Sequence, residues 1–170
     1  MKTPMASLLT NATTADAADV AALRNAVASA LTERHGIGHW SSVSTVAGIR
    51  SSLKRSSLYI VRDSAGRAVA TLELATTRPA AIDDRCFTDI ARPLYVVGMA
   101  VDPGRQRRGI GRQCIADAVD ICRRWPADGL RLDAYGAAAG AGAFYRKCGF
   151  VEVGRGEYRG RALICFERLV

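Results

Sequence analysis

A glycine-rich turn flanked by arginines is the first place where residue types and spacing suggest chemistry. It reads Gly104-Arg105-Gln106-Arg107-Arg108-Gly109-Ile110-Gly111 and directly follows Pro103. Glycines lack a Cβ and let the backbone approach a ligand closely, and the helix expected after the turn points unpaired N–H groups at the same place. With the helix dipole and the arginine charges, this pattern is typical of a site for an anion such as a diphosphate. The alternative is a helix start with a solvated N-terminus.

Two common phosphate motifs do not fit this turn. A P-loop requires Lys and then Ser or Thr after its second glycine, whereas Gly111 is followed by Arg112-Gln113. The dinucleotide fingerprint requires a third glycine where Cys114 stands. The turn therefore predicts a phosphate site of another kind.

The turn resembles the acyl-CoA signature of the GNAT superfamily of N-acyltransferases, Gln/Arg-x-x-Gly-x-Gly/Ala, here residues 106–111. Residues 97–103 are similar to the family's fourth strand and its proline exit, and Phe144-Tyr145-Arg146-Lys147-Cys148-Gly149-Phe150 is similar to its later helical motif. The resemblance covers about residues 94–152. It implies an acetyl-CoA-dependent N-acetyltransferase whose primary amine acceptor attacks directly in a ternary complex. A non-catalytic acyl-CoA-binding module on the same fold is the alternative.

The resemblance also implies roles for residues. The backbone of Met99 to Val101 would pair with the pantetheine arm, and the turn would hold the pyrophosphate. Tyr145 would stabilise the departing thiolate by a hydrogen bond rather than by proton transfer, since the unperturbed pKa of a tyrosine, about 10, exceeds that of a thiol, about 8.5. One departure is Ala138, which stands where many relatives have Asn. The predicted acetyl-CoA contacts are Met99, Ala100, Val101, Gln106, Arg107, Arg108, Gly109, Ile110, Gly111, Arg112, Phe144 and Tyr145.

The general base is harder to predict. Relatives often carry a Glu on the fourth strand, but residues 93–101 contain no acid. Glu73 and Asp133 are the remaining candidates, and they join Tyr145 as predicted catalytic residues. Base action through ordered water is an open alternative. His35 and His39 lie in a loop that could border the substrate, and neither is assigned a role.

Apolar periodicity predicts elements in the order βααβββαβαββ, a mixed α/β sheet in a single domain over residues 1–170. The resemblance implies that this sheet has the GNAT-like acyl-CoA N-acyltransferase fold. The resemblance also implies that loops at 34–42 and 78–92 border the acceptor. The sequence does not identify this acceptor, a small-molecule or peptide amine. Four helices are predicted: from a cap at 13–16 to about 33, over 43–55, from past 111 to about 125, and over 139–148. Seven strands are predicted over residues 6–12, 58–62, 68–77, 94–101, 130–135, 150–155 and 162–169.

Composition narrows the function classes further. The net charge is +8 and 21 of the 24 cations are arginine, yet aromatics make up only 6% and the densest arginine cluster is at the turn, so nucleic-acid binding ranks last. The five cysteines form no Cys-x-x-Cys pair and have no nearby His at ligand spacing, so we expect buried thiols and no metal. The sequence has no apolar stretch of eighteen residues and no long apolar segment after residues 1–5, so neither a membrane span nor a secretory signal is expected. We expect a cytoplasmic protein that does not bind membranes and could form a homodimer.

Overall fold

The computed structural model describes residues 7–170; residue 6, the predicted start of the first strand, and residues 1–5 lie outside this range. The elements follow the predicted order βααβββαβαββ. They are β1 (Thr10–Asn11), α1 (Ala17–His35), α2 (Val46–Ser52), β2 (Ser57–Arg62), β3 (Ala68–Ala75), β4 (Pro93–Val101), α3 (Ile110–Arg124), β5 (Gly129–Tyr135), α4 (Gly142–Lys147), β6 (Val151–Glu157) and β7 (Ala162–Leu169).

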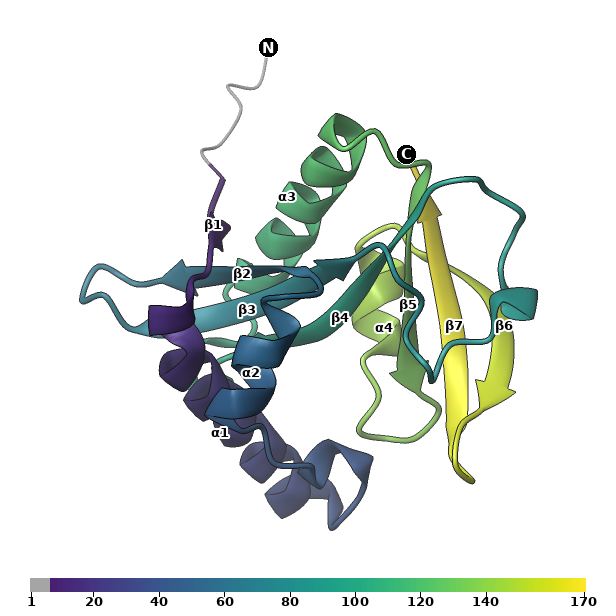
Figure 1. Ribbon diagram of the computed structural model, residues 1–170. Helices are drawn as coiled ribbons and strands as arrows, with labels where there is room; N and C mark the ends of the chain where they lie inside the picture. Colours follow the sequence, from purple (N-terminus) through teal and green to yellow (C-terminus); the bar gives the residue numbers. More distant parts are fainter. Residues whose placement is uncertain (1–6) are drawn as a thin grey trace.

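The seven strands form one sheet in the order β1-β2-β3-β4-β5-β7-β6 (Figure 1). Every neighbouring pair is antiparallel except β4 and β5, which run parallel and pair only over residues 93–95 and 129–131. Beyond Tyr95, the edge of β4 that faces β5 has no partner strand in the described chain. The predicted mixed α/β fold is therefore confirmed, with a sheet that opens at its centre.

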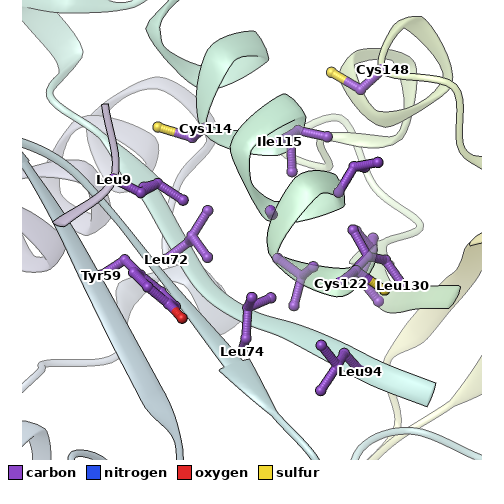
Figure 2. Close-up of a cluster of buried hydrophobic side chains, with 14 of the residues drawn as sticks. Leu9, Tyr59, Leu72, Leu74, Leu94, Cys114, Ile115, Cys122, Leu130 and Cys148 are labelled. Atoms are coloured by element: carbon purple, nitrogen blue, oxygen red, sulfur yellow. The ribbon is translucent and has the colours of Figure 1, made fainter. Parts of the chain in front are cut away.

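Helices cover both faces of this sheet (Figure 1). The larger core lies under α3 and α4, where the predicted apolar stripe of α3 packs on β3, β4 and β5 (Figure 2). The smaller core joins α1 and α2 to β2 on the opposite face. The α3 stripe consists of the fully buried Ile115, Ala118, Val119 and Cys122, which contact a layer that includes Leu72, Leu74, Leu94 and Leu130.

Two helices are shorter than the apolar pattern predicts. The Thr45 side chain accepts the N–H of Gly48 at 3.0 Å, and this cap starts α2 at Val46 rather than residue 43. In the turn before α4, a Cβ on Gly140 would lie 1.9 Å from the Tyr135 carbonyl oxygen. Residues 136–141 therefore follow the end of β5 as a tight turn, and α4 begins only at Gly142.

Four of the five cysteines are buried as expected, and Cys86 is half-buried. No helix of the part of the chain that the structure describes has both the length and the apolar content to cross a membrane.

Candidate active site

The arginine-rich turn connects the end of β4 to the first turn of α3. The Asp102 carboxylate accepts the N–H of Gly104 at 2.7 Å, and the Gln106 side chain donates to the Val101 carbonyl at 3.1 Å. Gly109, the N-cap of α3, has φ +85°, and Arg107 also has a positive φ of 60°. A non-glycine residue held in this region costs on the order of 1 kcal/mol, and such backbone conformations concentrate at ligand sites.

The backbone N–H groups of this turn are free to bind a ligand. The first backbone hydrogen bond into α3 runs from Gln113 N to Gly109 O at 3.0 Å, and the N–H groups of residues 107–112 donate to no acceptor within residues 7–170. Six consecutive donors at the N-terminus of a fifteen-residue helix attract an anion. A Cβ on Gly109 would meet nothing within 4 Å, so the space beside this glycine of the turn is open.

Three of the four clustered arginines are available to the same ligand. Arg107, Arg108 and Arg112 are exposed and form no ion pair with a carboxylate in the described chain. Arg105 instead pairs with Asp63 at 3.0 Å and fixes the turn to the β2–β3 hairpin. Gln106, one of the predicted acetyl-CoA contacts, likewise uses its side chain to hydrogen-bond β4 and so holds the shape of the turn.

A bulge interrupts β4 beside the opening of the sheet. The register with β3 shifts so that Thr71 faces Ala100 while Glu73 faces Val97, which leaves Gly98 and Met99 opposite Leu72 alone. Gly98 has φ +57° and is exposed. The extra residue of a bulge leaves the ladder, so backbone N–H groups at Gly98 and Met99 can turn toward a ligand in the opening.

Tyr145 reaches the opening from α4. Its hydroxyl lies 3.9 Å from Met99 Sδ, and its ring packs edge-on against Phe144 and Phe150. Burial raises the pKa of Tyr145, and the nearby Asp133 charge adds to this shift, so the phenol remains protonated at neutral pH. Phe144 fills the space next to α3, where a Cβ on Gly111 would lie 3.2 Å from its ring.

Asp133 lies on β5, next to the unpaired edge of β4. Leu130, Leu132 and Ala134 belong to the core under α3 and α4, so the alternation of the strand directs Asp133 to the face of α1 and α2. Its carboxylate makes no side-chain hydrogen bond with residues 7–170, and burial raises its pKa. A half-buried carboxylate with a raised pKa, close to the Tyr145 hydroxyl, has the properties of a general base.

Glu73 occupies a different environment. Its carboxylate is buried, accepts from Arg24 Nη2 at 2.9 Å and from Ser56 Oγ at 2.6 Å. Both carboxylate oxygens of Glu73 thus already accept hydrogen bonds from neighbouring side chains. Of the two predicted base candidates, the geometry favours Asp133.

Two features of the α1 and α2 face were absent from the sequence prediction. The Arg24 guanidinium lies over the bulge, where a Cβ on Gly98 would be 2.5 Å from Nη2. Tyr135, two residues after Asp133 on the same face, stacks on His39 with ring centroids 5.1 Å apart, and Trp40 meets it edge-on at 5.6 Å. No sequence signal marked Arg24, while loop 34–42 was expected to border the acceptor.

Fold and turn together have the features expected of a site for an extended, diphosphate-bearing ligand at the open centre of the sheet. The residues present fit acetyl-CoA: six free N–H groups and three arginines for the pyrophosphate, and the unpaired β4 edge for the pantetheine. Residues 21–150 match the Acetyltransferase (GNAT) family, and the chain belongs to this family.

Solved structures agree with this assignment at the level of the fold. A ribosomal-protein-alanine N-acetyltransferase from Brucella melitensis is 19% identical with a TM-score of 0.72, covering 96% of this chain and 99% of that chain. A GNAT acetyltransferase from Listeria monocytogenes is 18% identical with a TM-score of 0.75, covering 96% and 94%. A Bacillus subtilis acetyltransferase in complex with CoA is 18% identical with a TM-score of 0.55, covering 72% and 82%. No curated protein matches the chain in sequence.

Residues 7–170 contain no group of three or more His, Cys, Asp or Glu side chains that could hold a metal ion.

Proposed function

We propose that this GNAT protein is an N-acetyltransferase that moves the acetyl group of acetyl-CoA to a primary amine by direct attack in a ternary complex. The observation that carries the proposal is the convergence of Tyr145, Asp133 and the Gly98 bulge on the opening between β4 and β5. A non-catalytic acyl-CoA-binding module would need the turn but neither Tyr145 nor a half-buried, unpaired carboxylate.

In this proposal the donor lies on the α3 and α4 side of the opening. The N–H groups of residues 107–112 and the side chains of Arg107, Arg108 and Arg112 hold the pyrophosphate. The edge of β4 past the bulge pairs with the pantetheine arm in the manner of an added strand. Acetyl-CoA, when bound, supplies the reactive thioester, whose carbonyl oxygen the N–H groups at the bulge polarise.

The acceptor amine enters from the α1 and α2 side. Its nitrogen bonds to the acetyl carbon as the carbon–sulfur bond breaks, and Asp133 takes the proton that the nitrogen gives up. Tyr145 donates a hydrogen bond to the departing sulfur. Because the pKa of Tyr145 is raised, transfer of its proton to the thiolate is unfavourable, and stabilisation by the hydrogen bond describes its role better. The thiolate takes up a proton from solvent, which balances the proton released through Asp133.

The direct test measures free thiol release from acetyl-CoA with a panel of primary amines. The proposal expects acceptor-dependent thiol release and an acetylated amine identified by mass spectrometry. A protein that binds acetyl-CoA in calorimetry but releases no thiol with any amine would be the non-catalytic module instead.

Tyr145→Phe is expected to lower kcat by about 10- to 100-fold, because it removes one hydrogen-bond donor to the developing thiolate. The dissociation constant of acetyl-CoA should change little, since the ring and its packing against Phe144 and Phe150 are retained. Tyr59→Phe is the matched control, because Tyr59 is another buried tyrosine, placed in the core away from the opening. Wild-type turnover in Tyr145→Phe would remove this hydroxyl from the mechanism.

No acetyl-enzyme is expected on a cysteine. Burial is the main cause that raises the pKa of Cys114 and of Cys165 to about 12, and it also raises the pKa of Cys122 and Cys148, so these thiols stay protonated at neutral pH. Intact mass spectrometry after incubation with acetyl-CoA alone should show unmodified protein. Initial rates with both substrates varied should give intersecting lines. An acetyl adduct together with parallel lines would replace direct attack by a covalent route.

A further inference from the structure

The acceptor side of the opening carries a free guanidinium nitrogen. Arg24 extends from α1 across the exposed Gly98, and one nitrogen, Nη2, is held by Glu73. Its other terminal nitrogen, Nη1, would lie 3.0 Å from a Cβ on Gly98, makes no hydrogen bond with residues 7–170 and keeps contact with solvent. Glu73 and Ser56 thus fix the guanidinium over the bulge, while Nη1 can bind an oxygen of a ligand.

Asp133 lies across the opening from this guanidinium. Gly98 is on β4 and Asp133 on the neighbouring β5, and continuing the last paired register, Tyr95 with Arg131, brings Val97 level with Asp133. The Arg24 guanidinium and the Asp133 carboxylate both lie on the α1 and α2 face of the sheet. The opening therefore has a hydrogen-bond donor on the β4 side and an unpaired carboxylate on the β5 side, both on the same face of the sheet.

An aromatic surface continues this site beyond Asp133. Tyr135, His39 and Trp40 form it, and the Trp40 indole donates to the Gly36 carbonyl at 3.0 Å. The ring of Trp40 folds over Gly38, where a Cβ would lie 2.5 Å from it. Burial, and then the charge of Arg161, lowers the pKa of His39, so this ring is neutral at pH 7 and offers an apolar face.

The charges around this side of the opening are balanced and separated. Arg24 and Glu73 form one ion pair, Arg161 lies near the aromatic surface, and Asp133 has no ion-pair partner in residues 7–170. A polycation would meet two arginines, whereas an amine that carries its own carboxylate finds a partner for each charge. A separate polar network on β4, β5, β7 and the segment before β4 satisfies its own charges: Asp84 contacts Tyr95 and Arg131, and Arg131 pairs with Glu167.

Resting on the N-acetyltransferase activity proposed above, we infer that the acceptor is an α-amino acid with an apolar side chain. Its amino group lies beside Asp133, its carboxylate accepts from Arg24 Nη1, and its side chain packs on the surface of Tyr135, His39 and Trp40. Arg24 is then the residue that selects the acceptor, and Glu73 is the residue that positions Arg24.

The test compares each of the common α-amino acids with the amine that lacks its carboxylate, for example phenylalanine with 2-phenylethylamine. A charge-assisted hydrogen bond to the carboxylate predicts that kcat/KM is roughly 100-fold higher for the amino acid of an apolar pair. Phenylalaninamide, which keeps the amine and a carbonyl but has no charge, is expected to behave like the amine. Spermidine is expected to be a poor acceptor.

Arg24→Lys identifies the residue responsible. The lysine ammonium still pairs with Glu73 but offers no second fixed nitrogen, so the ratio of kcat/KM between amino acid and amine should fall at least about tenfold. Because unpairing a buried carboxylate can unfold a protein, the charge-free pair Arg24→Gln with Glu73→Gln is a second variant, expected to show the same loss of preference. Arg123→Lys, on the exposed side of α3 beside Asp120, is the control and should keep the wild-type ratio.

The outcomes separate the two proposals. Preference for the decarboxylated amine, for spermidine or for phenylalaninamide, or an unchanged ratio in Arg24→Lys, overturns the inference and leaves the acetyltransferase intact. If no amine of any kind is acetylated while acetyl-CoA binds, the proposed activity fails and the inference with it.

Discussion

Gly109→Glu is expected to abolish acetyl-CoA binding, with an increase in the dissociation constant of at least about 100-fold measured by calorimetry. Two effects act together. Gly109 has φ +85°, a conformation that costs a residue with a Cβ on the order of 1 to 2 kcal/mol. The new carboxylate also stands within the turn that carries the six free N–H groups, where it is expected to compete with the pyrophosphate for these donors and to repel it.

Gly160→Glu is the matched control for this variant. Gly160 has φ +76°, and a Cβ there also meets nothing within 4 Å, but it lies in the turn between β6 and β7, remote in the sheet from α3. Both variants add one negative charge at a glycine with positive φ, so they differ only in their position in the fold. Thermal unfolding verifies that both fold. Wild-type affinity in Gly109→Glu would move the donor site away from this turn.

The donor side could be predicted because its signals are local in the sequence. The spacing of Gln106, Gly109 and Gly111 and the apolar stripe of α3 each depend on residues within one or two helical turns. The structure adds what spacing alone does not contain: Arg105 and Gln106 hold the turn to its neighbours, while the backbone N–H groups of residues 107–112 and three exposed arginines have no partner within residues 7–170.

The acceptor side depends on contacts between distant parts of the chain. Arg24 and Glu73 are 49 residues apart, and nothing in the helical pattern of α1 distinguishes Arg24 from a solvated arginine. The packing of His39 on Tyr135 likewise requires a loop before α2 to meet the end of β5. The bulge in β4 is a one-residue change of register against β3, which a run of apolar residues does not reveal.

These non-local contacts also decide the choice between the two predicted base candidates. From the sequence, Glu73 and Asp133 are equivalent acids on predicted strands. In the fold, the Glu73 carboxylate is occupied by Arg24 and Ser56, whereas Asp133 has no side-chain partner in the described chain. The Glu73 carboxylate therefore holds neighbouring side chains in place, whereas the Asp133 carboxylate is free to accept a proton.

Asp133→Asn is therefore expected to lower kcat by about 100-fold or more, the usual contribution of a positioned general base, while the acetyl-CoA dissociation constant stays near wild type. The pH dependence gives the second readout. Burial raises the pKa of Asp133, so its carboxylate reaches the proton-accepting form at a higher pH than an ordinary aspartate does. The wild-type rate should rise with pH through this raised pKa, and Asp133→Asn should lose that limb.

In Asp133→Asn, the free energy of unfolding is expected to stay the same or rise although kcat falls. An acid whose pKa is higher in the folded than in the unfolded state binds protons more tightly when folded, so its ionisation destabilises the fold as pH rises above the unfolded value. Asp133→Asn removes this penalty at neutral pH and should leave Tm unchanged or raised. Glu73→Gln is the informative comparison, because it leaves the partly buried Arg24 without its counter-ion and should lower Tm. Wild-type turnover in Asp133→Asn would return base action to ordered water or to Glu73.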